Sequence, residues 1–254
     1  KAHLGLVGEK SVIHEQIKAL ICQLTFFHSY HDLEIIAIYD EVYQEDFQWM
    51  RWYPHFKIHT VNSIAMINSE NKRDQILGSL YQILKDRKQK EEESKKESTF
   101  LPHFLFLIDE PKWIMDHSIM EYLEKEGYNL GFSIIYTSHL RANLPENIGT
   151  IAMLKNSEDG LLLIDEREEK QENFRLHNMQ GIPLEWLGRN LGVLEHMQGI
   201  SAQIPNSITF FQMYQVERPS QLRIEERWRK NNSSKSLAVP LGARAAGDYV
   251  YLNL

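Results

Sequence analysis

The chain has a single cysteine, Cys22, among 254 residues, so an internal disulfide framework is excluded and a reducing compartment is indicated. It has no run of about 18 apolar residues, the length that would predict a membrane-spanning helix. It also lacks a signal-peptide pattern. The 11 histidines show no metal-ligand spacing such as HExxH, and there is no GxSxG motif. These absences argue against a disulfide-rich secreted protein, a zinc enzyme and a hydrolase of the GxSxG type.

Basic residues are too few to balance the acidic ones. The 28 Lys and Arg residues face 35 Asp and Glu residues, which gives a net charge of −7. Since affinity for nucleic acid comes mainly from clustered Lys and Arg, we expect no nucleic-acid partner. The hydrophobic content of 43% and charged content of 25% are ordinary for a globular protein.

Strand-type and helix-type segments alternate along the first part of the chain, which predicts an α/β fold with a mainly parallel sheet. Apolar runs predict strands over residues 4–7, 33–39, 56–61, 105–108, 132–137, 150–154 and 161–164. Helical periodicity predicts helices over residues 10–28, 47–52, 72–87, 113–126 and 183–196. We expect Pro54 to end the second helix, and the charged segment 86–99 to be a solvated helix end or loop.

The composition changes near residue 207. Beyond it lie a basic-aromatic ERWRK, a polar NNSSKS with linker composition, and two short strand signals, LAVPLG and DYVYLNL. We therefore expect one domain over 1–206 and, over 207–254, a linker with strands that lead to a further domain or pack on the same core. Because Lys1 directly precedes the first predicted strand, we also expect the chain to be part of a longer protein.

A strand-like segment at the N-terminus is followed by part of a phosphate-binding motif. His3–Gly8 (HLGLVG) precedes Lys10 and Ser11, in the strand–loop–helix setting of a P-loop. The pattern GxxxxGK[ST] uses the Lys to contact the phosphates and the Ser or Thr to hold Mg²⁺. Its two glycines fall on Leu4 and Glu9. The segment therefore matches only the end of the motif.

Glu9 is the most serious departure from that pattern. Its carboxylate repels phosphate, and its Cβ obstructs the close approach of the loop backbone. Two glycines remain nearby, Gly5 and Gly8. The sequence thus leaves two interpretations open, a degenerate nucleotide site or a strand-to-helix turn that binds no ligand. If a latent site survives, Glu9→Gly is predicted to improve nucleotide binding.

A second apolar strand, within HFLFLIDEP, ends in Asp109 and Glu110. In an active NTPase the Asp orders Mg²⁺ and the Glu activates the attacking water. The alternative is an acidic strand end that stabilises the start of the next helix. A similar LLLIDE at 161–166 is followed by a hairpin-like turn and return strand, so we interpret it as structural.

Two further positions complete the set of candidate residues. Thr137 ends the FSIIYT strand, where RecA-like ATPases place a polar residue that senses the γ-phosphate; the alternative is a polar loop start. Trp49 and Trp52 lie in a dense aromatic cluster. Aromatic residues at this spacing belong either to a core or to a protein interface.

These segments, in this order, resemble the FtsK/SpoIIIE branch of RecA-like ATPases, and more closely the EssC/EccC/YukB coupling ATPases of type VII (WXG100) secretion. The N-terminal region through WMRWYPH resembles the degenerate ATPase-like domain before that family's first motor domain. LIDEP and GFSIIYTSHLRANLPENIGTIAML match its Walker B strand and the following strand-loop-strand. The tail SLAVPLGARAAGDYVYLNL resembles the strands leading into the next domain, so the resemblance covers nearly the whole chain.

The resemblance implies a RecA-like fold with an impaired nucleotide site. Glu110 is then a vestigial catalytic residue and Asp109 a Mg²⁺ ligand only if nucleotide binds. The nucleotide-binding positions are Gly5, Gly8, Lys10, Ser11, Asp109 and Thr137, with no cofactor expected unless the site works with Mg-ATP. Trp49 and Trp52 become candidate interface residues.

The resemblance also implies a cellular role. The chain would be a non-hydrolysing or weakly active cytoplasmic domain of a membrane-anchored protein, linking the membrane part to motor domains that export WXG100 proteins. Its expected partners are the adjacent ATPase domains, other secretion membrane components and, indirectly, WXG100 substrates, with a homo-oligomer as one arrangement of the full protein. The alternatives are an active ATP-hydrolysing motor domain and a fragment of a FtsK-like DNA translocase, which the acidic balance disfavours.

Overall fold

The computed structural model describes residues 3–93, 99–125, 128–146, 148–164, 170–177, 179, 181–194, 209–214, 216, 218–230, 239–245 and 248–252. The chain divides into two compact units, Lys1–His196 and Met197–Leu254. The predicted domain boundary at residue 206 lies outside the described residues and stays a prediction.

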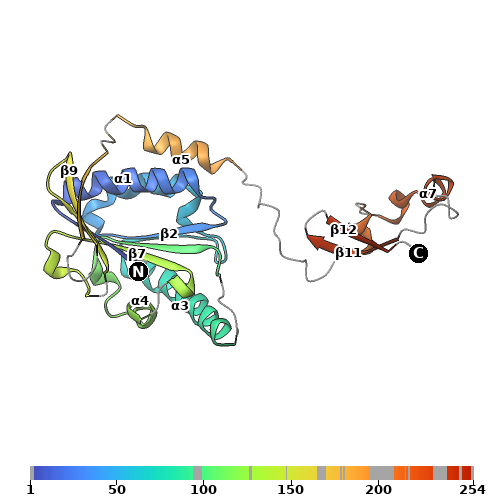
Figure 1. Ribbon diagram of the computed structural model, residues 1–254, viewed down its shortest axis with the longest axis horizontal. Helices are drawn as coiled ribbons and strands as arrows, with labels where there is room; N and C mark the ends of the chain where they lie inside the picture. Colours follow the sequence, from blue (N-terminus) through green and yellow to red (C-terminus); the bar gives the residue numbers. More distant parts are fainter. Residues whose placement is uncertain are drawn as a thin grey trace. The chain divides into compact units, whose positions relative to one another are not determined.

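The first unit is built on an eight-stranded sheet with the strand order β10-β9-β8-β1-β7-β6-β2-β5 (Figure 1). Pairing is parallel from β8 through β5 and antiparallel from β8 to β10. The strands are β1 (His3–Val7), β2 (Leu33–Ile38), β5 (Met66–Ile67), β6 (His103–Ile108), β7 (Phe132–Ser138), β8 (Thr150–Leu154), β9 (Asp159–Ile164) and β10 (Lys170–Arg175). This confirms the predicted α/β class with a mainly parallel sheet.

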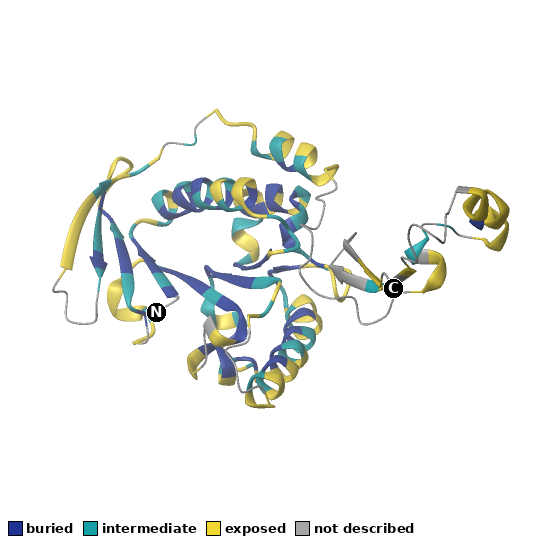
Figure 2. Ribbon diagram, turned by 45° about the vertical axis from the view of Figure 1, so that its right-hand side comes forward, coloured by how far each residue is buried: buried dark blue, intermediate teal, exposed yellow. Residues whose placement is uncertain are grey.

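Helices cover both faces of this sheet. In Figure 1, α1 (Lys10–Phe27) and α5 (Leu184–Gly192) lie on one face, and α3 (Glu70–Glu93) and α4 (Met120–Lys125) lie on the other. Successive side chains of a strand point to opposite faces, so Ile35 packs in the core beneath α1 while Ile36 packs in the core beneath α3. All six residues of β2 are buried, as its continuous apolar run predicts, and Figure 2 shows the central strands buried between helices.

Several predicted elements are corrected by the structure. The helix predicted over 113–126 is replaced by a 3₁₀ turn, η4 (Pro111–Trp113), and the short α4. Between them the chain forms turns, with the His117 N–H bonded to the Ile114 carbonyl oxygen and the Met120 N–H to the His117 carbonyl oxygen, so the helix begins only at Met120. The predicted strand at 56–61 shortens to β3 (Lys57–Ile58). The strands β4 (Ser63–Ile64) and β5 were missed because each spans only two residues. The predicted helix over 72–87 extends to Glu93 within the charged segment.

The aromatic segment after β2 forms a chain of short helices, α2 (Gln44–Phe47), η2 (Gln48–Trp52) and η3 (Pro54–Phe56). Trp49 is only 7% exposed, and its indole Nε1 donates a hydrogen bond to the Asp46 carbonyl oxygen at 2.7 Å. This burial leaves Trp49 little surface for a partner and favours the core alternative for this residue. Trp52 is half-buried, with the Arg189 guanidinium of α5 3.5 Å from its ring centroid.

The second unit contains the two strands that the tail predicted. β11 (Val239–Ala245) and β12 (Asp248–Leu252) pair antiparallel. Two short helices, α6 (Phe210–Met213) and α7 (Ile224–Lys230), and a 3₁₀ turn, η7 (Pro219–Leu222), precede them. Among the described residues, no helix has the length and apolar character needed to cross a membrane.

Candidate nucleotide site

The candidate residues meet where β1, β6 and β7 end side by side. Val7 of β1 pairs with Ser138 of β7, and Ile108 of β6 pairs with Tyr136 of β7. The carboxyl ends of parallel strands in an open α/β sheet are where ligands gather. Chain segments far apart in sequence are thereby brought together as predicted.

Asp109, directly after β6, is at the centre of this site. Its side chain is 1% exposed, and its Oδ2 lies 3.1 Å from the Lys10 ammonium. Lys10 also donates a hydrogen bond to the main-chain oxygen of Asp109 at 3.2 Å. The hydroxyl of Thr137 donates to Asp109 Oδ1 at 2.6 Å. Three of the predicted residues are therefore in direct contact.

His14 is a member of the site that the sequence did not suggest. Its Nε2 lies 3.4 Å from Asp109 Oδ2, and its Nδ1 lies 3.1 Å from Asp46 Oδ2. Its ring meets those of Tyr43 and Phe47 edge-on, each at 4.9 Å between centroids. His14 follows Lys10 by four residues on one helix face, and this spacing was the signal available in the sequence.

The environment of Asp109 favours its ionised form. Burial alone would raise the pKa of this carboxyl. Hydrogen bonds with His14 and Thr137, and the charges of Lys10 and His14, oppose burial and hold the pKa below its usual value. The site therefore holds a buried carboxylate whose charge is met by the protein itself.

The connection between β1 and α1 does not form a phosphate-binding loop. β1 ends at Val7 and α1 begins at Lys10, so only Gly8 and Glu9 lie between them. A P-loop places four residues between its two glycines, and their backbone N–H groups wrap the phosphates. Here the Gly8 N–H donates instead to the Ser138 carbonyl oxygen at 3.1 Å. The loop backbone needed for phosphate binding is absent from this described segment.

The two predicted glycines have packing roles. Gly5 lies inside β1, where an added Cβ would come within 2.6 Å of Leu144 Cδ1. At Gly8, an added Cβ would come within 2.8 Å of the Leu154 carbonyl oxygen. Each glycine therefore allows a neighbouring element to approach β1 closely, which accounts for its presence without a ligand.

The contacts of Glu110 and the exposed position of Ser11 indicate roles other than nucleotide binding. The Glu110 carboxylate accepts a hydrogen bond from the Lys112 N–H at 3.4 Å and so caps η4. Lys112 in turn forms an ion pair with Asp40 at the end of β2. Ser11 is exposed on the first turn of α1. Within the described residues, no group of three or more His, Cys, Asp or Glu side chains is placed to hold a metal ion.

The residues present therefore do not fit Mg-ATP in the manner of a P-loop. Lys10, which would contact phosphate, is directed to Asp109. Asp109, which would order Mg²⁺, already has Lys10, His14 and Thr137 as partners.

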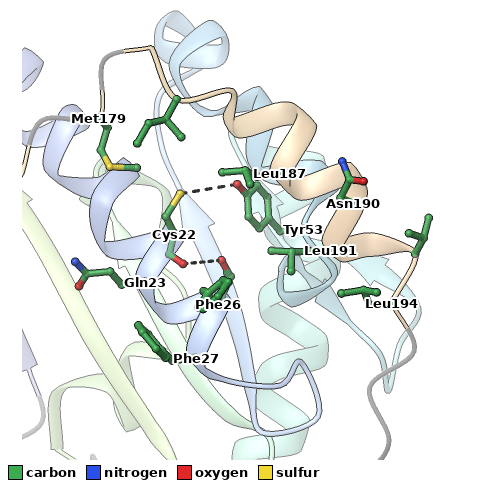
Figure 3. Close-up of a pocket in the computed structure, with 13 residues that line it drawn as sticks. Cys22, Gln23, Phe26, Phe27, Tyr53, Met179, Leu187, Asn190, Leu191 and Leu194 are labelled. Carbon is green, nitrogen blue, oxygen red and sulfur yellow. Dashed lines mark hydrogen bonds between the residues drawn. The ribbon is translucent and has the colours of Figure 1, made fainter.

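A separate apolar cavity of about 580 Å³ lies between α1 and α5 (Figure 3). The rings of Phe26 and Phe27 at the end of α1 border it and are 74% and 76% exposed. The Tyr53 hydroxyl donates to the Leu184 carbonyl oxygen at 2.9 Å and ties α5 to the body of the unit. The side chains that line this cavity are uncharged, so it offers no counter-charge for a phosphate.

The known proteins that this chain matches in sequence include two ESX secretion system proteins. The chain is 37% identical to the ESX secretion system protein EccC of Geobacillus thermodenitrificans over 253 residues, and 37% identical to the ESX secretion system protein YukB of Bacillus subtilis over 251 residues. Each match covers 99% of this chain and 17% of the relative, so the chain spans only 17% of the length of these proteins. No family model matches the chain.

A solved structure supports the fold. ATPases 2 and 3 of EssC from Geobacillus thermodenitrificans align with a TM-score of 0.55 and 13% identity, over 75% of this chain and 42% of that one. At this identity the likeness concerns the fold alone. It agrees with the predicted P-loop ATPase architecture.

Proposed function

The chain is a homologue of one segment of the EccC, YukB and EssC proteins of type VII secretion, and from this premise we propose that it is an ATPase-like domain that does not hydrolyse ATP. The observation that carries this proposal is the two-residue connection, Gly8 and Glu9, between β1 and α1. Phosphoryl transfer depends almost entirely on positioning and charge stabilisation of the phosphates. Without a loop to position them, Asp109 and Glu110 are insufficient.

We propose that the work of this domain is mechanical. As a cytoplasmic domain of a membrane-anchored protein, it would link the membrane part to motor domains that export WXG100 proteins. Its direct partners would be the neighbouring ATPase domains and other secretion components. The half-buried Trp52 would be a contact residue for a neighbouring domain, whereas the burial of Trp49 supports a role in the core. The net charge of −7 supports a role without nucleic acid.

The activity claim is tested by a hydrolysis assay on the purified chain. We expect no release of phosphate from Mg-ATP above the background of a Glu110→Gln variant. The matched variant is informative because Glu110 is the residue that would activate water, and its replacement leaves the Asp109 contacts in place. Turnover at about 1 s⁻¹ or faster that disappears in Glu110→Gln would overturn the proposal.

The cellular part of the proposal has its own test. In the longer protein, Glu110→Gln within this segment is expected to leave export of WXG100 proteins unchanged. Asp109→Ala, which removes a buried group, is expected to reduce export through loss of folded protein. Loss of export in a Glu110→Gln variant that is expressed at the normal level would show that catalysis in this segment is needed.

A further inference from the structure

Lys10 is directed inward, and the contacts it makes set its role. Its ammonium lies 3.1 Å from Asp109 Oδ2 and 5.1 Å from the centroid of the Tyr43 ring, and its side chain is 35% exposed. The Asp109 side chain is 1% exposed. Because an isolated charge at such burial is costly, Asp109 needs a positive partner from the protein or from a bound ion. Lys10 supplies it.

The polar contacts extend from Asp109 to the aromatic segment through His14. The two ring nitrogens of His14 face Asp109 and Asp46, at 3.4 Å and 3.1 Å from the respective Oδ2 atoms. Phe47 lies edge-on to His14 and stacks on Tyr39 with 4.7 Å between centroids. One imidazole therefore joins α1, the end of β6 and α2.

We propose that these residues, Lys10, His14, Asp46, Asp109 and Thr137, form a structural network that takes the place of nucleotide and Mg²⁺ at the strand ends. We call it the Asp109 network. Lys10 acts as the internal counter-ion of Asp109, and His14 fastens the 44–52 segment to the strand ends. In an active site the Lys would meet phosphate and the Asp would meet Mg²⁺; in this chain the two meet each other.

The inference rests on the proposed non-hydrolysing role and adds its physical consequence. A motor domain changes conformation because nucleotide binds its states with different affinity. A site whose charges are satisfied internally gives nucleotide no such preference. The Asp109 network therefore holds α1, β6, β7 and the 44–52 segment in one arrangement, which suits a domain that transmits position between its neighbours.

A double-mutant cycle tests the counter-ion. Lys10→Met and Asp109→Asn are each expected to lower the melting temperature of the chain by about 5 °C or more, since each leaves the other partner uncompensated. The double variant is expected to lose less than the sum of the two shifts. Lys18→Met is the matched control, because Lys18 lies on the same helix and its ion-pair partner is the partly exposed Glu15, whose side chain is 39% exposed, and not a buried carboxylate. It should leave the melting temperature unchanged.

The outcomes of this cycle are decisive. Additive shifts, or a Lys10→Met variant as stable as the unmodified chain, would overturn the proposal. If Lys10→Met does not fold but the double variant does, the coupling is shown directly. If neither folds, removal of Asp109 does not relieve the loss of Lys10, and the counter-ion role is rejected.

Hydrogen exchange tests the fastening by His14. In His14→Leu, amides of the 44–52 segment are expected to exchange at least about tenfold faster, since local opening becomes easier. Lys18→Met should show no change there. Unchanged protection in a folded His14→Leu variant would contradict the proposal. These results are separable from the hydrolysis assay, because a domain can be inactive without an Asp109 network, and phosphate release would refute the proposed function whatever the cycle shows.

Discussion

The two halves of the candidate nucleotide site differ in what the chain has kept. At the end of β1, the connection to α1 consists of Gly8 and Glu9, and the Gly8 N–H bonds to the neighbouring strand end. At the end of β6, Asp109 stands where a Walker B carboxylate stands and is well partnered. The end of β1 therefore has no phosphate-binding loop, whereas the end of β6 keeps the Walker B-type carboxylate of Asp109.

The two halves differ because the β1–α1 connection has no use without a bound phosphate, whereas Asp109 can be stabilised by other side chains of the protein. A phosphate-binding loop acts through its backbone N–H groups. Without phosphate these groups have no function, and a connection as short as Gly8 and Glu9 does not supply them. A buried carboxylate can be satisfied by protein groups, and Lys10, His14 and Thr137 satisfy Asp109. A motif residue can therefore occur for structural reasons in a domain that lacks the chemistry of the motif.

The largest effect on stability is expected from replacing Asp109, the carboxylate that the site has kept. Asp109→Ala leaves Lys10, His14 and Thr137 without their shared partner and opens a void at a buried position. We expect a loss of about 3–5 kcal/mol in the free energy of unfolding, measured by urea denaturation. Glu110→Ala, one residue along and half-exposed, is the control and should cost about 0.5 kcal/mol or less. Equal unfolding midpoints for the two variants would contradict the account.

A smaller effect is expected in the short connection. In Gly8→Ala the new Cβ would lie 2.8 Å from the carbonyl oxygen of Leu154. This oxygen belongs to the backbone of β8 and cannot move aside as a flexible side chain can. We expect a loss of about 1–3 kcal/mol because β8 must shift. Gly78→Ala within α3 is the control, since nothing lies within 4 Å of its added Cβ. It should be neutral or stabilising by up to about 1 kcal/mol. A neutral Gly8→Ala would show that the connection is not held tightly against β8.

The smallest effect is expected at Glu9, where the sequence predicted a gain in nucleotide binding if a latent site survives. Glu9→Gly removes one carboxylate, but it does not lengthen the connection or free the Gly8 N–H from Ser138. A glycine is also accepted at a helix N-cap at a cost of only a few tenths of a kcal/mol. We expect calorimetry to detect no Mg-ATP binding to this variant. Mg-ATP binding that is detectable in Glu9→Gly and weaker in the unmodified chain would show that a latent nucleotide site survives.

Much of the fold could be predicted from the sequence because its strands are continuous apolar runs. The segments at β2, β6 and β7 have this pattern, and buried parallel strands require it. The short β4 and β5 could not be found, since two residues carry no periodicity. The 113–126 helix was wrong because turn hydrogen bonds between residues 114 and 120 replace its first turns, so that the helix starts at Met120.

The site could be predicted only in part. Lys10 and Asp109 were found because each follows a strand that the apolar pattern identifies, and Thr137 because it ends the predicted strand 132–137. The motif comparison could not reveal that Lys10 turns toward Asp109, since this depends on the length of the connection and on the register of the strands. His14 and Asp46 were missed because they belong to no nucleotide motif. Trp49 could not be assigned to core or surface, since its burial depends on tertiary packing.

If the strand-end site is satisfied by the chain's own residues, the melting temperature of the unmodified chain will be the same with and without Mg-ATP. A ligand bound only by the folded state at a hundredfold excess over its dissociation constant would stabilise it by about 2.7 kcal/mol, which raises the melting temperature of a domain of this size by about 5–11 °C. We expect no shift at millimolar Mg-ATP. A rise of several degrees that is lost in Lys10→Met would show that nucleotide binds at this site.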